Sequence, residues 1–513
     1  MKKLVSLLLA AALLLSLTSF ALAEDAVKEI DVMVWYRDID DLNFSEMPYY
    51  NDPETGITAQ SGVKANFNQV KGGDWSTKLN LMLTSAEYPD IIQHGSINLE
   101  MYGVDQEILL PLDEYIDQYM PNYKALLEAD PQLAQSLRSS DGKMYQIGWI
   151  IPQNICTDSH LFINTQWLKN LNLEMPTTIE EYEQVLIAFR DQDADGDGDP
   201  SNEIPMGGTY GSMVSGLQFM FSCWGIPAND KYVSIDDNNK VYSHLQHENL
   251  RAALETLSRW YQEGLIDLEA VTQDENAFEA KVNAGNYGSF WRWRMTAMGT
   301  SEEVYSQYSF ILPPAVDGVQ AQLVRYLELP SFGAALTVGC EDVEAACKWM
   351  DTQFQWDNMI NGYNGKYGEF WGYDENGKVD IYPMSDGTRT VPGQSSMYYC
   401  CGADYFAKVN MPSHRIEKTS YCEAYEAAGV IEKNSRHILQ KLVTLTVDES
   451  TQRDLLFAEI DKYAKESITS FIVKGVTDDS WNAYVKTLDQ LRIGEYIQLY
   501  QTAYDRYLEA NGI

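Results

Sequence analysis

The chain has 513 residues, of which 75 are acidic and 37 are basic, so its formal net charge is −38. This length exceeds what one compact core accommodates, and we expect two or more domains. The negative charge repels phosphate backbones, which argues against nucleic acid as a partner. Hydrophobic residues make up 45% of the chain, as is typical of a packed globular protein.

Residues 1–23 have the pattern of a signal peptide. Lys2 and Lys3 precede an apolar run from Leu4 to Leu17, and Ala21-Leu22-Ala23 is a small-residue cleavage site. The run is shorter than the roughly 20 residues that a membrane-spanning helix needs. No cysteine lies near the cleavage site, so we expect no lipid anchor. The mature chain is therefore predicted to be secreted or periplasmic.

The first part of the mature chain alternates between strands and helices. Strands are predicted at 30–34 and 89–92, helices at 78–84 and 113–120, and an extended run at 144–151. This alternation favours an α/β fold.

A second α/β block follows. We expect a strand at 161–164, a helix that Thr178 caps and that ends near Arg190, helices at 249–264 and 274–284, and a strand at 287–291. Residues 365–378 indicate a loop and a hairpin, and helical patterns dominate toward the C-terminus.

An acidic loop, DQDADGDGDPSNE, spans Asp191 to Glu203. Oxygen ligands at every second residue and a glycine at the turn are typical of calcium loops. Two frames fit the residues. In one, Asp193, Asp195 and Asp197 lead, with Gly198 at the turn and the Asp199 carbonyl next. In the other, Asp191, Asp193 and Asp195 lead, with Gly196 at the turn and Asp199 later. A solvated loop without metal is the alternative.

Six stretches in order resemble the family 1 extracellular solute-binding proteins of bacterial ABC importers. The stretches are Gly72-Gly73-Asp74-Trp75, 78–83, 88–92, 110–115, 141–145 and 176–181. The Asn202-Glu203-Ile204-Pro205 ending also resembles a loop of the longer members, in which such loops bind calcium structurally. The resemblance therefore favours the first frame, with Asp193, Asp195, Asp197, Asp199 and Glu203 as the predicted calcium ligands.

The resemblance implies a periplasmic-binding-protein-like α/β fold. Two discontinuous lobes would be joined by hinge strands, with a helix-rich C-terminal part. We place the first lobe at 24–150 and 330–390, and the second at 151–329 and 391–513. The implied function is capture of a carbohydrate, expected to be an oligosaccharide, between the two lobes. The protein is expected to be a monomer that is not an enzyme and that delivers the sugar to a membrane ABC permease. A secreted carbohydrate-active enzyme, a receptor for a non-sugar solute such as a peptide, and an adhesion module are the alternatives.

Candidate ligand contacts are aromatic and arginine side chains near strand ends or turns. Ligands in α/β sheets sit beyond the carboxyl ends of strands, and flat rings suit the apolar faces of sugars. For each tryptophan, a place in the core is the alternative. The candidates are Trp35, Tyr36, Arg37, Trp75, Trp149, Trp224, Trp291, Arg292 and Trp293.

Overall fold

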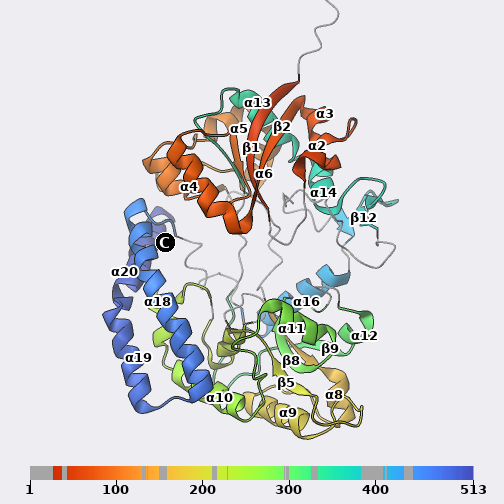
Figure 1. Ribbon diagram of the computed structural model, residues 1–513, viewed down its shortest axis with the longest axis vertical. Coiled ribbons are helices and arrows are strands. Elements are labelled where there is room, and N and C mark those ends of the chain that lie inside the picture. The colour runs from red at the N-terminus through yellow and green to blue at the C-terminus, as the bar shows by residue number, and fades with distance from the viewer. Residues whose placement is uncertain are drawn as a thin grey trace, which may run out of the picture.

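The structure is a computed structural model that describes residues 27–36, 43–129, 134–135, 137–148, 159–210, 216–227, 229–293, 295, 300–324, 333–382, 408–410, 413–431 and 443–511. These residues form two lobes, one above the other in Figure 1, each with its own sheet and hydrophobic core. The predicted two-lobed α/β fold is confirmed. The predicted signal peptide, Arg37 and Trp149 lie outside the described residues.

The first lobe is built on a four-stranded sheet in the order β10-β3-β1-β2. β1 pairs in parallel with β2 and β3, whereas β10 is antiparallel to β3. Val32, Met33 and Val34 of β1 are each at most 2% exposed, because helices cover both faces of the sheet. The strands are β1 (Lys28–Tyr36), β2 (Val63–Lys71), β3 (Ile91–Gln93) and β10 (Ala334–Leu336).

Two hydrophobic clusters cover the two faces of this sheet. Val32 and Ile91 face the cluster that includes α5 and α13, whereas Met33 and Ile92 face the cluster that includes α4. The helices of the lobe are α2 (Pro48–Asn51), α3 (Ile57–Ser61), α4 (Trp75–Ser85), α5 (Asp113–Tyr119), α6 (Pro121–Ala129), α13 (Val343–Thr352) and α14 (Trp356–Asn364).

A small sheet in the order β11-β12-β13 extends the first lobe. Its strands are β11 (Trp371–Tyr373), β12 (Val379–Ile381) and β13 (Val409–Asn410). β11 and β12 form an antiparallel hairpin closed by the bond from the Asp374 amide to the Lys378 carbonyl, at 2.8 Å. The hairpin predicted within 365–378 is therefore present.

The second lobe has a sheet in the order β5-β8-β4-β9. All five residues of β4 are buried, which reflects a central strand covered on both faces. The strands are β4 (His160–Asn164), β5 (Ile204–Gly207), β8 (Tyr287–Arg292) and β9 (Tyr308–Ile311), and a separate hairpin is formed by β6 (Val233–Ile235) and β7 (Val241–Ser243).

The helices of the second lobe follow the sequence pattern closely. Thr178 caps α9 through a complete capping box with Glu181, as predicted. The helices are α8 (Thr165–Asn170), α9 (Ile179–Asp191), α10 (Leu250–Gln262), α11 (Glu275–Asn283), α12 (Glu302–Tyr305) and α16 (Ser413–Ala427).

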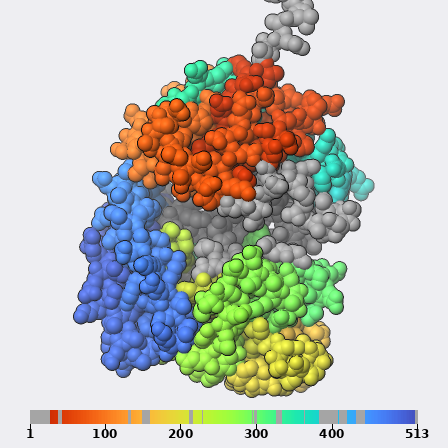
Figure 2. Space-filling view, in the orientation of Figure 1, coloured from red at the N-terminus to blue at the C-terminus, as the bar shows by residue number. Residues whose placement is uncertain are grey.

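Three long helices form the C-terminal part: α18 (Val447–Lys474), α19 (Asp478–Gln490) and α20 (Ile493–Asn511). α18 packs against α10 of the second lobe, and it also contacts the π-helical turn η3 (Glu100–Asp105) of the first lobe. Figure 2 shows this column, in blue, reaching from the second lobe to the first along one side. The predicted helix-rich C-terminal part is confirmed.

Between consecutive described segments, the chain changes lobe three times. The passages lie between Gly148 and Ser159, between Val324 and Gly333, and between Asn410 and Ser413. Residues 149–158, 325–332 and 411–412 lie outside the described part, so the predicted hinge strands and exact lobe bounds stay predictions. Among the described residues, no helix combines the length and the apolar character needed to cross a membrane.

We expect Cys223 and Cys347 to resist alkylation in the folded protein at mildly alkaline pH. Both thiols are free and buried, and burial raises the pKa of each to about 12. The thiolate is the nucleophile, so a buried, protonated thiol reacts only after unfolding. Mass spectrometry of the two cysteine peptides after iodoacetamide treatment, with and without guanidinium chloride, measures this. Rapid labelling of either peptide in the native protein would contradict the burial.

Candidate functional site

The parallel strands of the first lobe end at the side that faces the second lobe. β1, β2 and β3 end at Tyr36, Lys71 and Gln93. Two of the passages between the lobes attach at this edge. The His94 amide donates to the Gly333 carbonyl at 2.8 Å, and Ile147 pairs with Ala334. The carboxyl ends of these strands therefore border the space between the lobes, where ligands of α/β sheets bind.

The second lobe presents a matching edge. β8 ends at Arg292, which pairs with His160, and β5 runs parallel to β8 and ends at Gly207. His160 opens the second sheet directly after the first passage from the other lobe. Strand ends from both sheets therefore face one interlobe region.

The candidate residues of the first lobe differ in how much surface they offer. Trp35 and Tyr36, at the end of β1, are half-buried, and the Lys71 ammonium lies 5.9 Å from the centre of the Tyr36 ring. Trp75 is buried and its indole nitrogen donates to the Ser96 carbonyl at 2.9 Å. Trp75 thus packs within its lobe, whereas Tyr36 and Lys71 together offer a ring and a cation at the strand ends.

The candidate tryptophans of the second lobe differ in how deeply they are buried. Trp291 is fully buried and stacks on Phe219, with ring centres 5.5 Å apart. Trp224, in the 3-10 segment Leu217–Trp224, is buried in the same core. Trp293, directly after β8, is 37% exposed. Of these three, Trp293 has the ring with the most accessible surface.

Arg292 is engaged inside the second lobe. Its guanidinium forms a buried ion pair with Glu279, and Nη1 donates to the Met295 carbonyl and to Thr300 Oγ1, each at 2.9 Å. Burial raises the pKa of Glu279, and the charge of Arg292 opposes that shift. These bonds hold the segment after β8 in place, so Arg292 helps to position the neighbouring Trp293.

A cavity of about 240 Å³ lies where the C-terminal helices meet the first lobe. Glu100, Arg138 and Gln146 line it from the first lobe, and Ser450 and Arg453 line it from α18. Of the aromatic residues singled out in the sequence, those that the structure describes do not border it. The sequence offered no signal for it, because the two walls are more than 300 residues apart in the chain.

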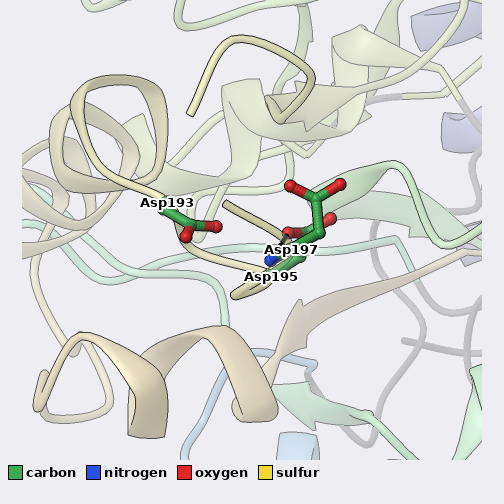
Figure 3. Close-up of side chains that lie close together, drawn as sticks. All are labelled: Asp193, Asp195 and Asp197. Carbon is green, nitrogen blue, oxygen red and sulfur yellow. Dashed lines mark hydrogen bonds between the residues drawn. The ribbon is translucent and has the colours of Figure 1, made fainter. Parts of the chain in front are cut away.

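The acidic loop connects α9 to β5 and gathers the carboxylates of one predicted frame. Oxygen atoms of Asp193, Asp195 and Asp197 lie within 4.8 Å of one another (Figure 3). Asp191 instead ends α9 and pairs with Arg190 at 2.7 Å. The geometry is that of the frame in which Asp193 leads.

Turns within the loop orient these carboxylates. Asp193 accepts hydrogen bonds from the amides of Gly196 and Gly198, at 2.9 and 3.0 Å. Gly196 has φ +82° and Gly198 has φ +95°, conformations that favour glycine. Asp199 accepts from the amide and the hydroxyl of Ser201, which lowers the pKa of that carboxyl.

Glu203 closes the loop on its inner side. One carboxylate oxygen accepts from the Ala194 amide at 2.7 Å, while Oε2 is buried and has no hydrogen-bond partner. Asn170 of α8 donates to the Ala194 carbonyl at 2.8 Å, an anchor that the sequence did not reveal. Buried carboxylate oxygens are normally paired, so the free oxygen of Glu203 and the three clustered aspartates fit a hard cation chemically.

The chain has clear relatives among solute-binding proteins. The fructooligosaccharide ABC transporter substrate-binding protein FusA of Streptococcus pneumoniae serotype 4 is 24% identical over 475 residues, covering 88% of this chain and 86% of FusA. The structure of FusA in complex with kestose superposes on this chain with a TM-score of 0.82 and a sequence identity of 22%. An EF-hand mutant of FusA superposes with a TM-score of 0.81 and a sequence identity of 22%. Each of these comparisons covers 94% of this chain and 100% of the FusA chain. An extracellular solute-binding protein of Bifidobacterium longum subsp. infantis gives 0.82 at 21% identity, covering 94% and 99%.

The family model for bacterial extracellular solute-binding proteins matches residues 48–354, well over half of the chain. The match includes the sheet of the second lobe, strands β2, β3 and β10 of the first lobe, the acidic loop and two of the passages between the lobes. Proteins of this kind bind solutes and are not enzymes. The chain therefore belongs to the bacterial extracellular solute-binding protein family.

Proposed function

We propose that this chain is the extracellular substrate-binding component of an ABC importer and that it holds an oligosaccharide between its two lobes. The observation that carries the proposal is the convergence of strand ends from both sheets on one interlobe region. The relationship to FusA, a protein named for fructooligosaccharide transport, supports a sugar as the ligand.

The proposed contacts are the aromatic and polar side chains at these strand ends. Trp35, Tyr36 and Trp293 provide rings with accessible surface, and Lys71 adds a hydrogen-bond donor. Trp75, Trp224, Trp291 and Arg292 pack behind them within their lobes, and Arg37 and Trp149 complete the candidate set. Rotation of the lobes about the passages would enclose the ligand, and a membrane permease would recognise the closed form.

We further propose that the mature protein is a secreted monomer and that its acidic loop binds calcium. Asp193, Asp195, Asp197, Asp199 and Glu203 are the proposed ligands, and the metal would fix the connection between α9 and β5. A solved relative described as an EF-hand mutant supports a cation loop in proteins of this fold. The proposed role is structural, because the loop joins the amino end of β5, whereas the ligand region lies beyond its carboxyl end at Gly207.

A thermal-shift screen against neutral oligosaccharides tests the proposed function. A ligand at 100 times its dissociation constant adds about 2.7 kcal/mol to the free energy of unfolding. We therefore expect the melting temperature to rise by a few degrees with at least one glycan series, fructooligosaccharides being the first to try. The ligand should be recovered unchanged, which distinguishes a receptor from an enzyme. Shifts only with peptides, or conversion of the sugar, would contradict the proposal.

A further inference from the structure

The small sheet of the first lobe and the turn before it carry three exposed tyrosines, two of which lie together. Tyr367, Tyr373 and Tyr382 are 54%, 42% and 42% exposed. Among the described residues, only one other aromatic side chain is more than a third exposed, and that is Trp293. We propose that the tyrosine ledge formed by Tyr367 and Tyr373, whose ring centres lie 6.2 Å apart, is a second carbohydrate-binding surface, which receives sugar units of a long oligosaccharide that extend beyond the cleft. The inference rests on the proposed function and specifies its substrate class.

Two rings of the ledge are held by a buried tryptophan. Trp371 is fully buried, and its indole nitrogen donates to Asn361 Oδ1 and to the Gly365 carbonyl, at 3.0 and 2.9 Å. Tyr367 and Tyr373 meet the Trp371 ring at steep angles of 76° and 79°, with centres 5.0 and 5.6 Å away. Rings fixed in this way lose little conformational entropy when a ligand packs on them.

Hydrogen bonds fix the ledge further. The Tyr373 hydroxyl donates to Asp357 Oδ1 at 2.5 Å, and the Tyr367 amide donates to Asn361 Oδ1 at 3.0 Å. A Cβ atom placed on Gly372 would lie 2.2 Å from the Tyr382 hydroxyl oxygen. Glycine at position 372 therefore permits the Tyr382 hydroxyl to lie close against the hairpin, on the face opposite to Trp371 and Tyr373, because side chains alternate along a strand.

The ledge lies on the side of the first lobe where the chain passes to the second. Tyr382 follows β12, and β12 pairs with β13, the last strand before α16 of the second lobe. Figure 1 shows β12 at the edge of the upper lobe, above α16. A ligand held between the lobes can therefore reach the ledge by extending toward this side.

The chemistry of the ledge suits a neutral sugar. Aromatic faces pack against the C–H faces of sugar rings, and phenol hydroxyls and the exposed Asp357 carboxylate can hydrogen-bond to sugar hydroxyls. Asp357 and Glu369 lie here together with the basic Lys366 and Lys408, so the surroundings carry charges of both signs. Packing on these rings and bonding to these hydroxyls requires no charge on the ligand, so the proposed occupant is an uncharged sugar unit.

Calorimetric titration with one neutral oligosaccharide series, from the disaccharide upward, tests the ledge. We expect Tyr367→Ala to weaken binding of the longest members about 3- to 10-fold, the range expected for one aromatic contact, and to leave binding of the shortest binding member unchanged. Tyr367→Phe keeps the ring and should retain most of the affinity for every length. Leu268→Ala, at a 61% exposed residue of the second lobe, is the control for removal of an exposed side chain.

The outcomes separate the two proposals. If the wild-type chain binds the series but Tyr367→Ala weakens all lengths equally or none, the ledge proposal fails and the proposed function stands. If affinities are unchanged but permease-stimulated uptake falls, the ledge is a protein-docking surface and the inference is overturned. If the wild-type chain binds no neutral glycan at all, both proposals fail together.

Discussion

Removing calcium is expected to lower the melting temperature of the mature protein by several degrees, and Glu203→Gln should reproduce most of that loss with calcium present. Oxygen atoms of Asp193, Asp195 and Asp197 lie within 4.8 Å of one another, where each pair of charges repels by roughly 1 to 3 kcal/mol near a protein surface. A bound cation would remove this repulsion. Calcium at 1,000 times its dissociation constant would stabilise the fold by about 4 kcal/mol.

Glu203 is the most informative position in the loop. Its Oε1 holds the Ala194 amide, and its buried Oε2 has no protein partner, so it connects the loop backbone to the proposed metal. The amide of glutamine can keep the bond to Ala194 but removes the charge. We therefore expect Glu203→Gln to melt at nearly the same temperature with calcium and with chelator. Differential scanning calorimetry under the two conditions measures the difference.

Asp191→Asn is the matched control. Asp191 belongs to the same acidic run, but it is exposed at the end of α9 and pairs with Arg190. An exposed ion pair contributes at most about 1 kcal/mol, so this variant should keep the full response to calcium. A wild-type chain that melts at the same temperature in calcium and in chelator would refute the metal site.

The acidic loop also shows how far the sequence could be interpreted. Alternating aspartates predicted a cation loop, but the residues alone allowed two frames, and the resemblance to relatives was needed to favour one. The structure groups Asp193 with Asp195 and Asp197 because α9 continues through Asp191, and the helix end sets where the loop begins. Helix boundaries are the least certain feature of sequence-based prediction, and the two frames differ by only two residues.

The tryptophans show which features of the candidate site could not be predicted from the sequence. Their place near strand ends was predictable, but which rings keep accessible surface was not. Trp291 and Trp293 are two residues apart, yet one is fully buried and the other is 37% exposed, because β8 ends between them at Arg292. The partners of Arg292 lie on α11 and on the segment after β8, and only the folded chain brings them together.

The C-terminal third was least accessible from sequence. Helices were predicted there, and they form, but α18 packs on α10 from a position nearly 200 residues away and reaches η3 in the other lobe. No local pattern encodes such contacts. The tyrosine ledge is similar, since its exposure depends on how β11 and β12 pack over α14.

Gly333→Ala is expected to be the most damaging glycine substitution among those that border the ligand region. A Cβ atom at this position would lie 1.6 Å from the Ile147 carbonyl oxygen and 2.7 Å from its carbonyl carbon. The obstacle is backbone, which a rotamer change cannot relieve. We expect a loss of about 3 kcal/mol in the free energy of unfolding, or more, since overpacking of this kind costs 1 to 3 kcal/mol even where side chains can adjust.

The site of the clash gives this substitution a functional consequence. The Ile147 carbonyl accepts from the Ala334 amide at 3.1 Å, and the Gly333 carbonyl accepts from the His94 amide at 2.8 Å. These bonds join two passages between the lobes to the end of β3. Separating them should misalign the lobes, so ligand affinity should fall together with a melting temperature lowered by about 5 °C or more.

Gly494→Ala makes the same chemical change at a position where we expect the free energy of unfolding to rise instead of fall. Gly494 lies in α20, with no atom within 4 Å of an added Cβ, and alanine favours the helix by up to about 1 kcal/mol. Calorimetry and ligand titration of both variants therefore separate a steric clash from a general effect of glycine replacement. Equal stability of Gly333→Ala and the wild type would mean that the two passages can move apart freely. In that case the pairing of Ile147 with Ala334 would not fix how the lobes are joined, and closure would depend on the third passage near α16.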